Sequence, residues 1–215
     1  MSSAPVEESF PARRRVPIQE RSRMRVERIL DAAATLVVQR GVEALTTREI
    51  ARVAAVPVAS LYQYFADKDA VLLALAERDM AEMDEQVLAD LADLGAPTVA
   101  EVVRTVLASF VTVYDRRPAF VELYLRGRTN AAVAQFGREH NARVARLLRA
   151  YAVDAGLALP TLTDQVVELA VEVGDRVFQL AYEHRRDGDP ALVAEGATMV
   201  TAYLERHAVD PPAPA

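Results

Sequence analysis

The chain has 215 residues, of which 52% are hydrophobic, and it carries a formal net charge of −6. This length allows one domain or two small ones, and the apolar fraction is ample for a buried core. The absence of cysteine excludes disulfides and thiolate metal sites. The longest uncharged run, Val53 to Ala66, has 14 residues and contains Pro57, so no transmembrane helix is predicted. Because no apolar signal-peptide core is present either, we expect a cytoplasmic protein.

The charge is distributed unevenly. Residues 1–70 contain 11 Lys and Arg against 9 acids, whereas residues 71–215 contain 14 against 22. An acidic body with a mildly basic head is compatible with docking on DNA through one end. Residues 1–20 contain three prolines and no periodicity, which predicts a disordered arm. The arginine run Arg13 to Arg15 is interpreted either as a solvated tail or as an arm that enters a minor groove.

A stretch that begins at Thr46 has the pattern of two short helices joined by a tight turn. Thr46 and Glu49 have the spacing of a capping box, in which each side chain accepts the other residue's amide. Pro57 suits the opening turn of the second helix, because its missing N–H is not needed there. Leu61 and Phe65, four residues apart, give this helix a buried edge. Its outward face is uncharged and consists of Val58, Ala59, Ser60, Tyr62, Gln63 and Tyr64.

Helical periodicity elsewhere predicts an all-α chain of about nine helices. A first helix should end at Gly41 and brace the helix-turn-helix pair. A fourth begins at Asp67 and is long enough, at about 1.5 Å per residue, to connect that pair to the rest. Caps and helix breakers then place the later helices after Thr98, Pro118, Gly127 with Asn130, Thr163 and Pro190.

Common catalytic motifs are absent. No two of the eight glycines lie within seven residues of each other, so neither a dinucleotide fingerprint nor a P-loop can be built. No G-x-S-x-G occurs, and no His lies in H-E-x-x-H or follows a Glu by three residues. Neighbouring acids such as Asp84 and Glu85 are interpreted as solvated surface. We therefore expect no enzyme, no cofactor and no metal.

Five short motifs lie in order between Arg23 and Ala76. They are Ile29–Ala33 (ILDAA), Arg40-Gly41, Thr46–Ala51 (TTREIA), Leu61–Phe65 (LYQYF) and Asp67–Leu72 (DKDAVL). In this stretch the chain resembles the N-terminal domain of TetR-family transcriptional regulators. The family often has Gly where Ala55 stands in the turn, and Ala in a left-handed conformation costs about 1 kcal/mol relative to Gly. It often has Ser where Pro57 stands, so one capping or phosphate contact is missing.

The resemblance implies a DNA-binding role for the uncharged face, for which the alternative is an ordinary exposed helix surface. Tyr62, Tyr64 and Lys68 would contact phosphates, and Lys68 also lies at a helix N-terminus, whose dipole favours phosphate. Thr47 and Arg48, at the start of the supporting helix, are expected to contact the DNA backbone. The residues implied to approach base edges are Val58, Ala59, Ser60 and Gln63.

The resemblance also implies an effector pocket inside the C-terminal helices. Its candidate lining residues are Phe110, Tyr114, Phe120, Tyr124, Phe136, His140 and Phe178, although ordinary core packing explains the aromatic residues as well. His140 is interpreted either as a ligand contact or as a core histidine with a protein partner. Asn130, Arg126 and Gln179 are weaker candidates for polar anchors.

The last two predicted helices, near residues 164–187 and 190–208, are almost continuously apolar, and the resemblance implies a homodimer built on them. Gly174 and Gly196 are expected to permit close helix approach. Placing Arg at Ala170, Gly174 or Ala197 should therefore split the dimer or unfold the chain.

We therefore divide the chain into a disordered arm (1–20), a helix-turn-helix DNA-binding domain (21–66), an effector-binding and dimerisation domain (67–208) and a disordered tail (209–215). The resemblance implies a homodimer that binds near-palindromic double-stranded DNA, usually as a repressor, and leaves it when a small organic molecule binds. One alternative is a helical carrier or enzyme with a fortuitous helix-turn-helix. Another is an activator or constitutive regulator without an effector.

Overall fold

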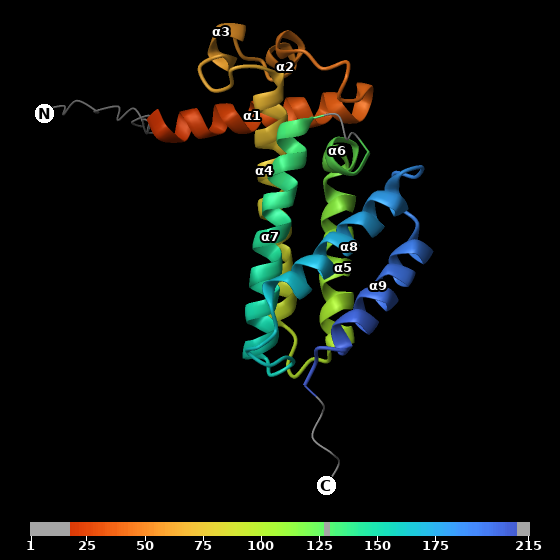
Figure 1. Ribbon diagram of the computed structural model, residues 1–215. Coiled ribbons are helices and arrows are strands. Elements are labelled where there is room, and N and C mark those ends of the chain that lie inside the picture. Colours follow the sequence, from red (N-terminus) through yellow and green to blue (C-terminus); the bar gives the residue numbers. More distant parts are fainter. Residues whose placement is uncertain (1–17, 127–129, 210–215) are drawn as a thin grey trace, which may run out of the picture.

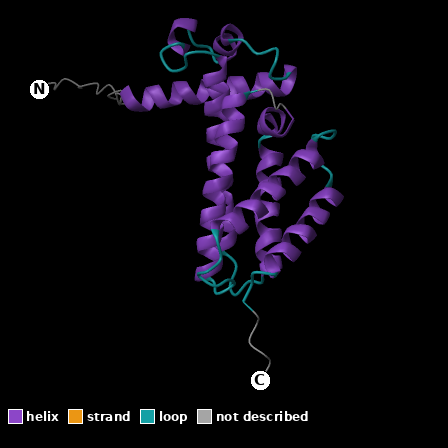
Figure 2. Cartoon of the chain, viewed as in Figure 1, coloured by secondary structure: helices purple, strands orange, loops and turns teal. Residues whose placement is uncertain are grey.

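The computed structural model describes residues 18–126 and 130–209, and every regular element in these ranges is helical (Figure 2). The elements are α1 (Ile18–Arg40), α2 (Thr47–Val53), α3 (Val58–Leu61), α4 (Lys68–Ala92), α5 (Val99–Arg116), α6 (Pro118–Phe120), the π-helix η1 (Val121–Arg126), α7 (Ala131–Asp154), α8 (Asp164–Tyr182) and α9 (Pro190–Glu205). The prediction of an all-α chain is confirmed. None of the described helices combines the length and the apolarity needed to cross a bilayer.

Side-chain caps begin several helices where the sequence predicts them. Thr46 accepts a backbone amide at 3.2 Å before α2, and Asp67 accepts one at 2.8 Å before α4. Thr98 takes part in a reciprocal capping box before α5. Thr163 precedes α8 as predicted, but its side chain makes no capping hydrogen bond. Local sequence therefore determines where most of these helices start.

The molecule consists of a head, α1–α3, and a body, α4–α9 (Figure 1). Helix α1 lies across one end of α4, and α2 and α3 pack on the side of α1 that faces away from the body. Helix α4 continues from the head into the body, where it packs against α5 and α7. Helices α8 and α9 pack against each other and cross this layer obliquely.

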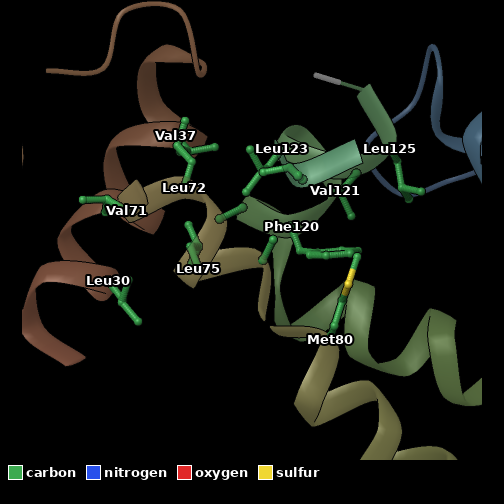
Figure 3. Close-up of a cluster of buried hydrophobic side chains, with 14 of the residues drawn as sticks. Leu30, Val37, Val71, Leu72, Leu75, Met80, Phe120, Val121, Leu123 and Leu125 are labelled. Atoms are coloured by element: carbon green, nitrogen blue, oxygen red, sulfur yellow. The ribbon is translucent and has the colours of Figure 1, made fainter. Parts of the chain in front are cut away.

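One apolar cluster joins the head to the body. It combines α1 (Leu30, Val37), α4 (Val71, Leu72, Leu75, Met80) and α6–η1 (Phe120, Val121, Leu123, Leu125) (Figure 3). Each of these side chains is at most 3% exposed. Because protein cores are close-packed, a displacement of α6 or of the first turns of α4 must change how α1 packs against the body.

Polar contacts supplement this cluster. Arg78 on α4 reaches α1, where its Nη1 lies 2.8 Å from an oxygen of Asp31. Arg186, which follows α8, pairs with Glu122 at 2.7 Å and donates to the Val38 carbonyl of α1 at 3.5 Å. Exposed ion pairs contribute about 1 kcal/mol or less, so the apolar cluster carries most of the head–body attachment.

Two predicted boundaries are wrong by a few residues. Helix α1 begins at Ile18, inside the segment predicted as a disordered arm, and Glu20 in its first turn favours a helix N-terminus. Val209, assigned to the disordered tail, donates its amide to the Leu157 carbonyl at 2.9 Å. The rest of the predicted arm, including its three arginines, the rest of the tail and Gly127 lie outside the described residues.

Candidate DNA-binding surface and effector cavity

The turn between α2 and α3 contains a residue in the left-handed region. Ala55 has a φ of 52°, the one positive φ at a non-glycine residue in the described chain. The Val56 amide donates to the Ala51 carbonyl at 3.0 Å, and the Ala55 amide donates to the Arg52 carbonyl at 3.3 Å. These two bonds form a Schellman motif, which usually has Gly at the left-handed position. The turn therefore keeps the geometry that favours Gly and holds Ala in it.

The nine residues predicted to contact DNA lie on α2, on α3, in the turn that follows α3 and at the start of α4, which together form the head end of the molecule (Figure 1). Arg48, Val58, Ala59, Tyr62 and Gln63 are exposed; Thr47, Ser60, Tyr64 and Lys68 are half-buried. Helix α3 is short, but a backbone bond from Phe65 to Leu61 at 3.0 Å continues its turn. The face predicted from the sequence therefore lies on α3 and the turn after it, whose backbone is held by hydrogen bonds.

Two tyrosines fasten the segment that follows α3 to different helices. The Tyr62 hydroxyl lies 3.0 Å from the Thr47 hydroxyl on α2, although the Tyr62 residue is 52% exposed. The Tyr64 hydroxyl instead donates to Ser22 on α1 at 3.2 Å. This hydrogen bond, together with the nearby Arg25, lowers the pKa of Tyr64. Both side chains are therefore held in place before DNA binds.

The exposed charges around this face are of both signs, and exposed acids of the head include Glu20, Glu27, Asp31 and Glu43. The described basic residues of α1 and α2 that are exposed are Arg21, Arg23, Arg28, Arg40, Arg48 and Arg52. Glu49 on α2 pairs with Arg40 at the end of α1, so its charge is compensated. Of the predicted capping box, the hydrogen bond from the Glu49 amide to the Thr46 hydroxyl is present. The Glu49 carboxylate contacts Arg40 and the Thr46 hydroxyl. Attraction of a phosphate backbone would therefore depend on individual arginines, such as Arg48 on α2, rather than on an excess of positive charge.

A cavity of about 130 Å³ lies in the body, between α4, α5, α7, α8 and α9. Six of the seven predicted effector contacts line it: Phe110, Tyr114, Phe120, Tyr124, His140 and Phe178. Phe136 does not. It lies on α7 one turn before His140, and the Arg143 guanidinium carbon is 5.3 Å from its ring centroid. Apolar walls with few polar groups are typical of small-molecule sites.

The aromatic side chains of the cavity wall form a connected group. Ring centroids are 5.2 Å apart for Tyr114 and Phe178, 5.9 Å for Tyr114 and Phe120, and 5.1 Å for Phe120 and Tyr124. Phe110 joins them at 5.7 Å from Phe178. Tyr114 is buried, and this burial raises the pKa of its hydroxyl well above the usual value. The rings therefore present faces, edges and two phenol groups to one space.

A carboxylate interrupts this apolar wall. Asp175 on α8 accepts from the Gln179 amide at 2.7 Å and is hydrogen-bonded by the Tyr124 hydroxyl. Its neighbour Glu172 accepts from Asn141 at 3.1 Å. Burial, followed by the charge of Glu172, raises the pKa of Asp175 to about 6, and burial also raises the pKa of Tyr124. A carboxylate whose ionised form is disfavoured by its surroundings is a candidate ligand contact.

His140 has a protein partner and also borders the cavity. Its Nε2 lies 2.8 Å from an oxygen of Asp84 on α4, and the residue is 3% exposed. His140 thus has the protein partner that the core interpretation requires, and its role as a ligand contact stays a prediction. Two of the weaker candidates lie elsewhere: Asn130 caps α7, and Arg126 pairs with Glu122 at 3.6 Å.

Sequence reasoning missed the polar members of the wall. Asn141 and Asp175 line the cavity, as do Met80 and Met83 of α4. Asp175 belongs to the one polar stripe of an otherwise apolar helix, which was the available signal. This stripe is exposed at Glu168 and partly buried against α7 at Glu172 and Asp175, a difference that is set by tertiary packing and that periodicity alone cannot give.

Met80 and Phe120 belong both to the cavity wall and to the cluster that seats α1. Figure 3 shows Met80 next to Phe120, with α1 on the other side of the first turns of α4. A molecule that fills the cavity would therefore contact side chains of the head–body junction.

The positions chosen for disrupting a dimer face inward. Ala170 and Gly174 line the cavity, and Ala197 packs against the main core. Arg at these sites would therefore disturb the interior of one chain rather than an interface. The large apolar residues that α8 and α9 leave exposed are Leu169, Leu180, Leu192 and Met199.

The two glycines of these helices differ. A Cβ at Gly196 would lie 2.5 Å from Cγ1 of Val177, so the predicted close approach of α8 and α9 is present there. A Cβ at Gly174 would meet nothing nearer than Cδ2 of Leu107, at 3.9 Å. The expectation of close approach is wrong for Gly174, which borders the cavity.

A helix-turn-helix head carried by a helical body that encloses a ligand-sized cavity defines a DNA-binding regulator of transcription. The chain belongs to the TetR family. Residues 29–75 match the family model of bacterial regulatory proteins of the tetR family, and residues 98–204 match that of the tetracyclin repressor-like C-terminal domain. It is accordingly a transcriptional regulator and not an enzyme.

Known proteins agree with this assignment. A TetR-family transcriptional regulator from Streptomyces coelicolor is 30% identical, with a TM-score of 0.70 over 85% of this chain and 99% of that one. The fatty acid degradation regulator FadR from Bacillus halodurans shares the fold, at 15% identity and a TM-score of 0.65 over 82% and 94%. An uncharacterised HTH-type transcriptional regulator of Mycobacterium tuberculosis is 26% identical over 81% of this chain and 84% of its own.

Proposed function

We propose that the protein is a homodimeric repressor that binds a near-palindromic operator and leaves it when a small organic molecule occupies the cavity. The observation that carries this proposal is that Met80 and Phe120 each belong both to the cavity wall and to the head–body cluster. A molecule that fits only one packing of these side chains shifts the head between positions. By linkage, DNA then weakens that molecule's affinity by the same factor.

Recognition is assigned to the face of α3 and the turn after it. Gln63 is exposed and uncharged, and a Gln side chain can pair bidentately with adenine. Lys68 begins α4, where its charge and the helix N-terminus both favour phosphate. Thr47 and Tyr62 already contact each other, which fixes one phosphate contact region.

Dimerisation is assigned to the outer face of α8 and α9. Leu169 and Leu180 on α8 and Leu192 and Met199 on α9 are each at least 40% exposed in the single chain. A second copy related by a two-fold axis would cover them, because an isologous interface pairs the same surface on both subunits. Two heads placed this way would reach successive major grooves about 34 Å apart.

The test of recognition starts from an operator selected from random duplexes. Gln63→Ala should relax preference at one base position per half-site by about 1–3 kcal/mol. Lys68→Ala should weaken all sequences alike and lower the salt slope by about 1 per half-site. Gln135→Ala, at an exposed glutamine on α7 and outside the head, α8 and α9, is the matched control and should change neither. An unchanged preferred sequence in Gln63→Ala would contradict base reading by this residue.

The test of dimerisation uses the exposed leucines. Leu169→Arg should convert the dimer to a folded monomer in sedimentation velocity, since it places an unpaired charge in the interface. Leu88→Arg, at a leucine of α4 that is 55% exposed and lies outside α8 and α9, is the control and should remain dimeric. A dimer that survives Leu169→Arg, with Leu192→Arg also intact, would reject this interface.

A further inference from the structure

The cavity wall has a distinctive balance of charge. Among the described residues that line it, Asp175 is acidic and none is Arg or Lys. The chain has a single lysine, Lys68, at the opposite end of α4. A carboxylate or phosphate group of a ligand would therefore find no fixed positive charge in this space, and it would be repelled by Asp175.

The two histidines on the wall are already engaged. His140 Nε2 lies 2.8 Å from Asp84, and the His207 ring packs edge-on against Tyr203 with centroids 5.5 Å apart. The Asp175 carboxylate, in contrast, is held by neutral groups, the amide of Gln179 and the hydroxyl of Tyr124. Its closest charged neighbour is another acid, Glu172. The local field is thus negative.

Aromatic rings surround the same space. Phe110, Tyr114, Phe120, Tyr124 and Phe178 all line it, and their rings are connected to one another with centroids 5.1–5.9 Å apart. Ring faces attract cations that lie within about 6 Å of the centroid. Gly137 positions one of these rings, because a Cβ there would collide with the Tyr124 side chain.

We propose that the effector is a lipophilic organic cation, a molecule with an apolar body and a protonated amine or quaternary ammonium group that pairs with Asp175 inside the aromatic wall. The proposal rests on the assignment of the cavity as an effector site, and it adds the chemical class of the effector. A buried anion without a counter-charge is unfavourable, and a bound cation would remove that penalty while its apolar part fills the void.

The test compares three probes with one skeleton and different charge: phenylbutylammonium, phenylbutanol and phenylbutanoate. Isothermal titration calorimetry of the full chain at pH 7.5 should give an affinity for the ammonium that is at least about tenfold higher than for the alcohol, with the carboxylate weakest. In Asp175→Asn the ammonium and the alcohol should bind within about threefold of each other, because only the ion pair is lost.

Glu168→Gln is the matched control, since it removes the same charge from an exposed position of α8. It should keep the preference for the ammonium. Tyr124→Phe keeps the ring and removes the hydroxyl, so it should retain most of the preference for the ammonium over the alcohol. It provides a second folded variant if Asp175→Asn no longer binds the alcohol.

Three outcomes would overturn the proposal: an ammonium that binds no better than the alcohol, a preference that survives Asp175→Asn, and binding of none of the probes. Release of operator DNA separates this failure from that of the proposed function. If the alcohol or the carboxylate releases DNA and the ammonium does not, the cavity is an effector site and the cationic class is wrong. If all three bind the cavity and none releases DNA, the effector function itself is wrong.

Discussion

The head and the body bury their apolar residues in different ways. In the head, Ile29, Val37, Ile50 and Leu61 are completely buried, and none of them lines the cavity of the body. In the body, a cavity of about 130 Å³ and the carboxylate of Asp175 lie among aromatic rings. A close-packed core holds a surface in one geometry, whereas a void permits side chains to be displaced. The difference fits the proposal of a rigid DNA-contacting surface in the head and an adjustable effector site in the body.

The largest expected effect comes from opening the head core. Leu61→Ala should lower the free energy of unfolding by about 3 kcal/mol, because it deletes most of a completely buried side chain from the head core. Leu107→Ala, at the cavity wall, should cost about 1 kcal/mol less, since its surroundings are already incomplete. Urea denaturation at a fixed protein concentration measures both. Equal losses would contradict the contrast between the two cores.

The next effect concerns charge inside the body. The pKa of Asp175 is raised from 3.8 to about 6, so the folded chain binds its proton more tightly than the unfolded chain does. Stability from this group is therefore present below pH 4 and is lost as the pH rises through about 6. At pH 7.5 Asp175→Asn should raise the free energy of unfolding by about 2 kcal/mol.

The difference between Asp175→Asn and the parent chain should shrink to near zero at pH 4. The groups that face Asp175 are Glu172 and Gln179 on α8, Tyr124 on η1, Asn141 on α7 and Tyr114 on α5. Glu168→Gln, on the exposed side of α8, should show no such pH-dependent gain. A gain that is constant from pH 4 to pH 8 would argue against titration of Asp175.

A smaller effect distinguishes the two glycines of α8 and α9. Gly174→Ala should stabilise the chain by about 1 kcal/mol, because it improves helix propensity and the added methyl makes only an ordinary contact with Leu107, at 3.9 Å. Gly196→Ala should destabilise it by about 1–3 kcal/mol, because the methyl would collide with Val177. Thermal melting of the two variants side by side is the measurement. The same sign for both would show that the cavity does not relieve packing at Gly174.

The smallest effect belongs to the strained turn of the head. Ala55→Gly should stabilise the chain by about 0.5 kcal/mol, since relief of the left-handed Ala exceeds the added entropy of the unfolded Gly. DNA affinity should stay within about twofold, because the turn already has the geometry that Gly adopts. A loss of stability in this variant would mean that Ala55 makes contacts that outweigh its strain.

The head was largely predictable because its structure depends on neighbours in sequence. Thr46, Asp67 and the apolar spacing of Leu61 and Phe65 act within one or two turns of helix, so their effects are visible in the chain itself. Even the departure at Ala55 was visible as a residue type at odds with its turn. The resemblance of residues 23–76 supplied the rest.

The body was predictable only in outline. The aromatic residues that line the cavity were identified as a group, but Phe136 lies outside it and Asp175 and Asn141 were missed. Their placement depends on the rotation of α7 and α8 about their own axes, which is set by packing among helices far apart in sequence. The inward direction of Ala170 and Gly174 was misjudged for the same reason.

Lys68 combines two features, a position at the first residue of α4 and the absence of any other lysine. Reagents that acylate ε-amines therefore have one internal target in the whole chain, and it lies beside the proposed phosphate contacts. A fluorophore attached there reports from the junction of head and duplex without any engineered cysteine. Reductive methylation would retain the charge and acetylation would remove it, so two simple labelling reactions isolate the electrostatic part of DNA binding.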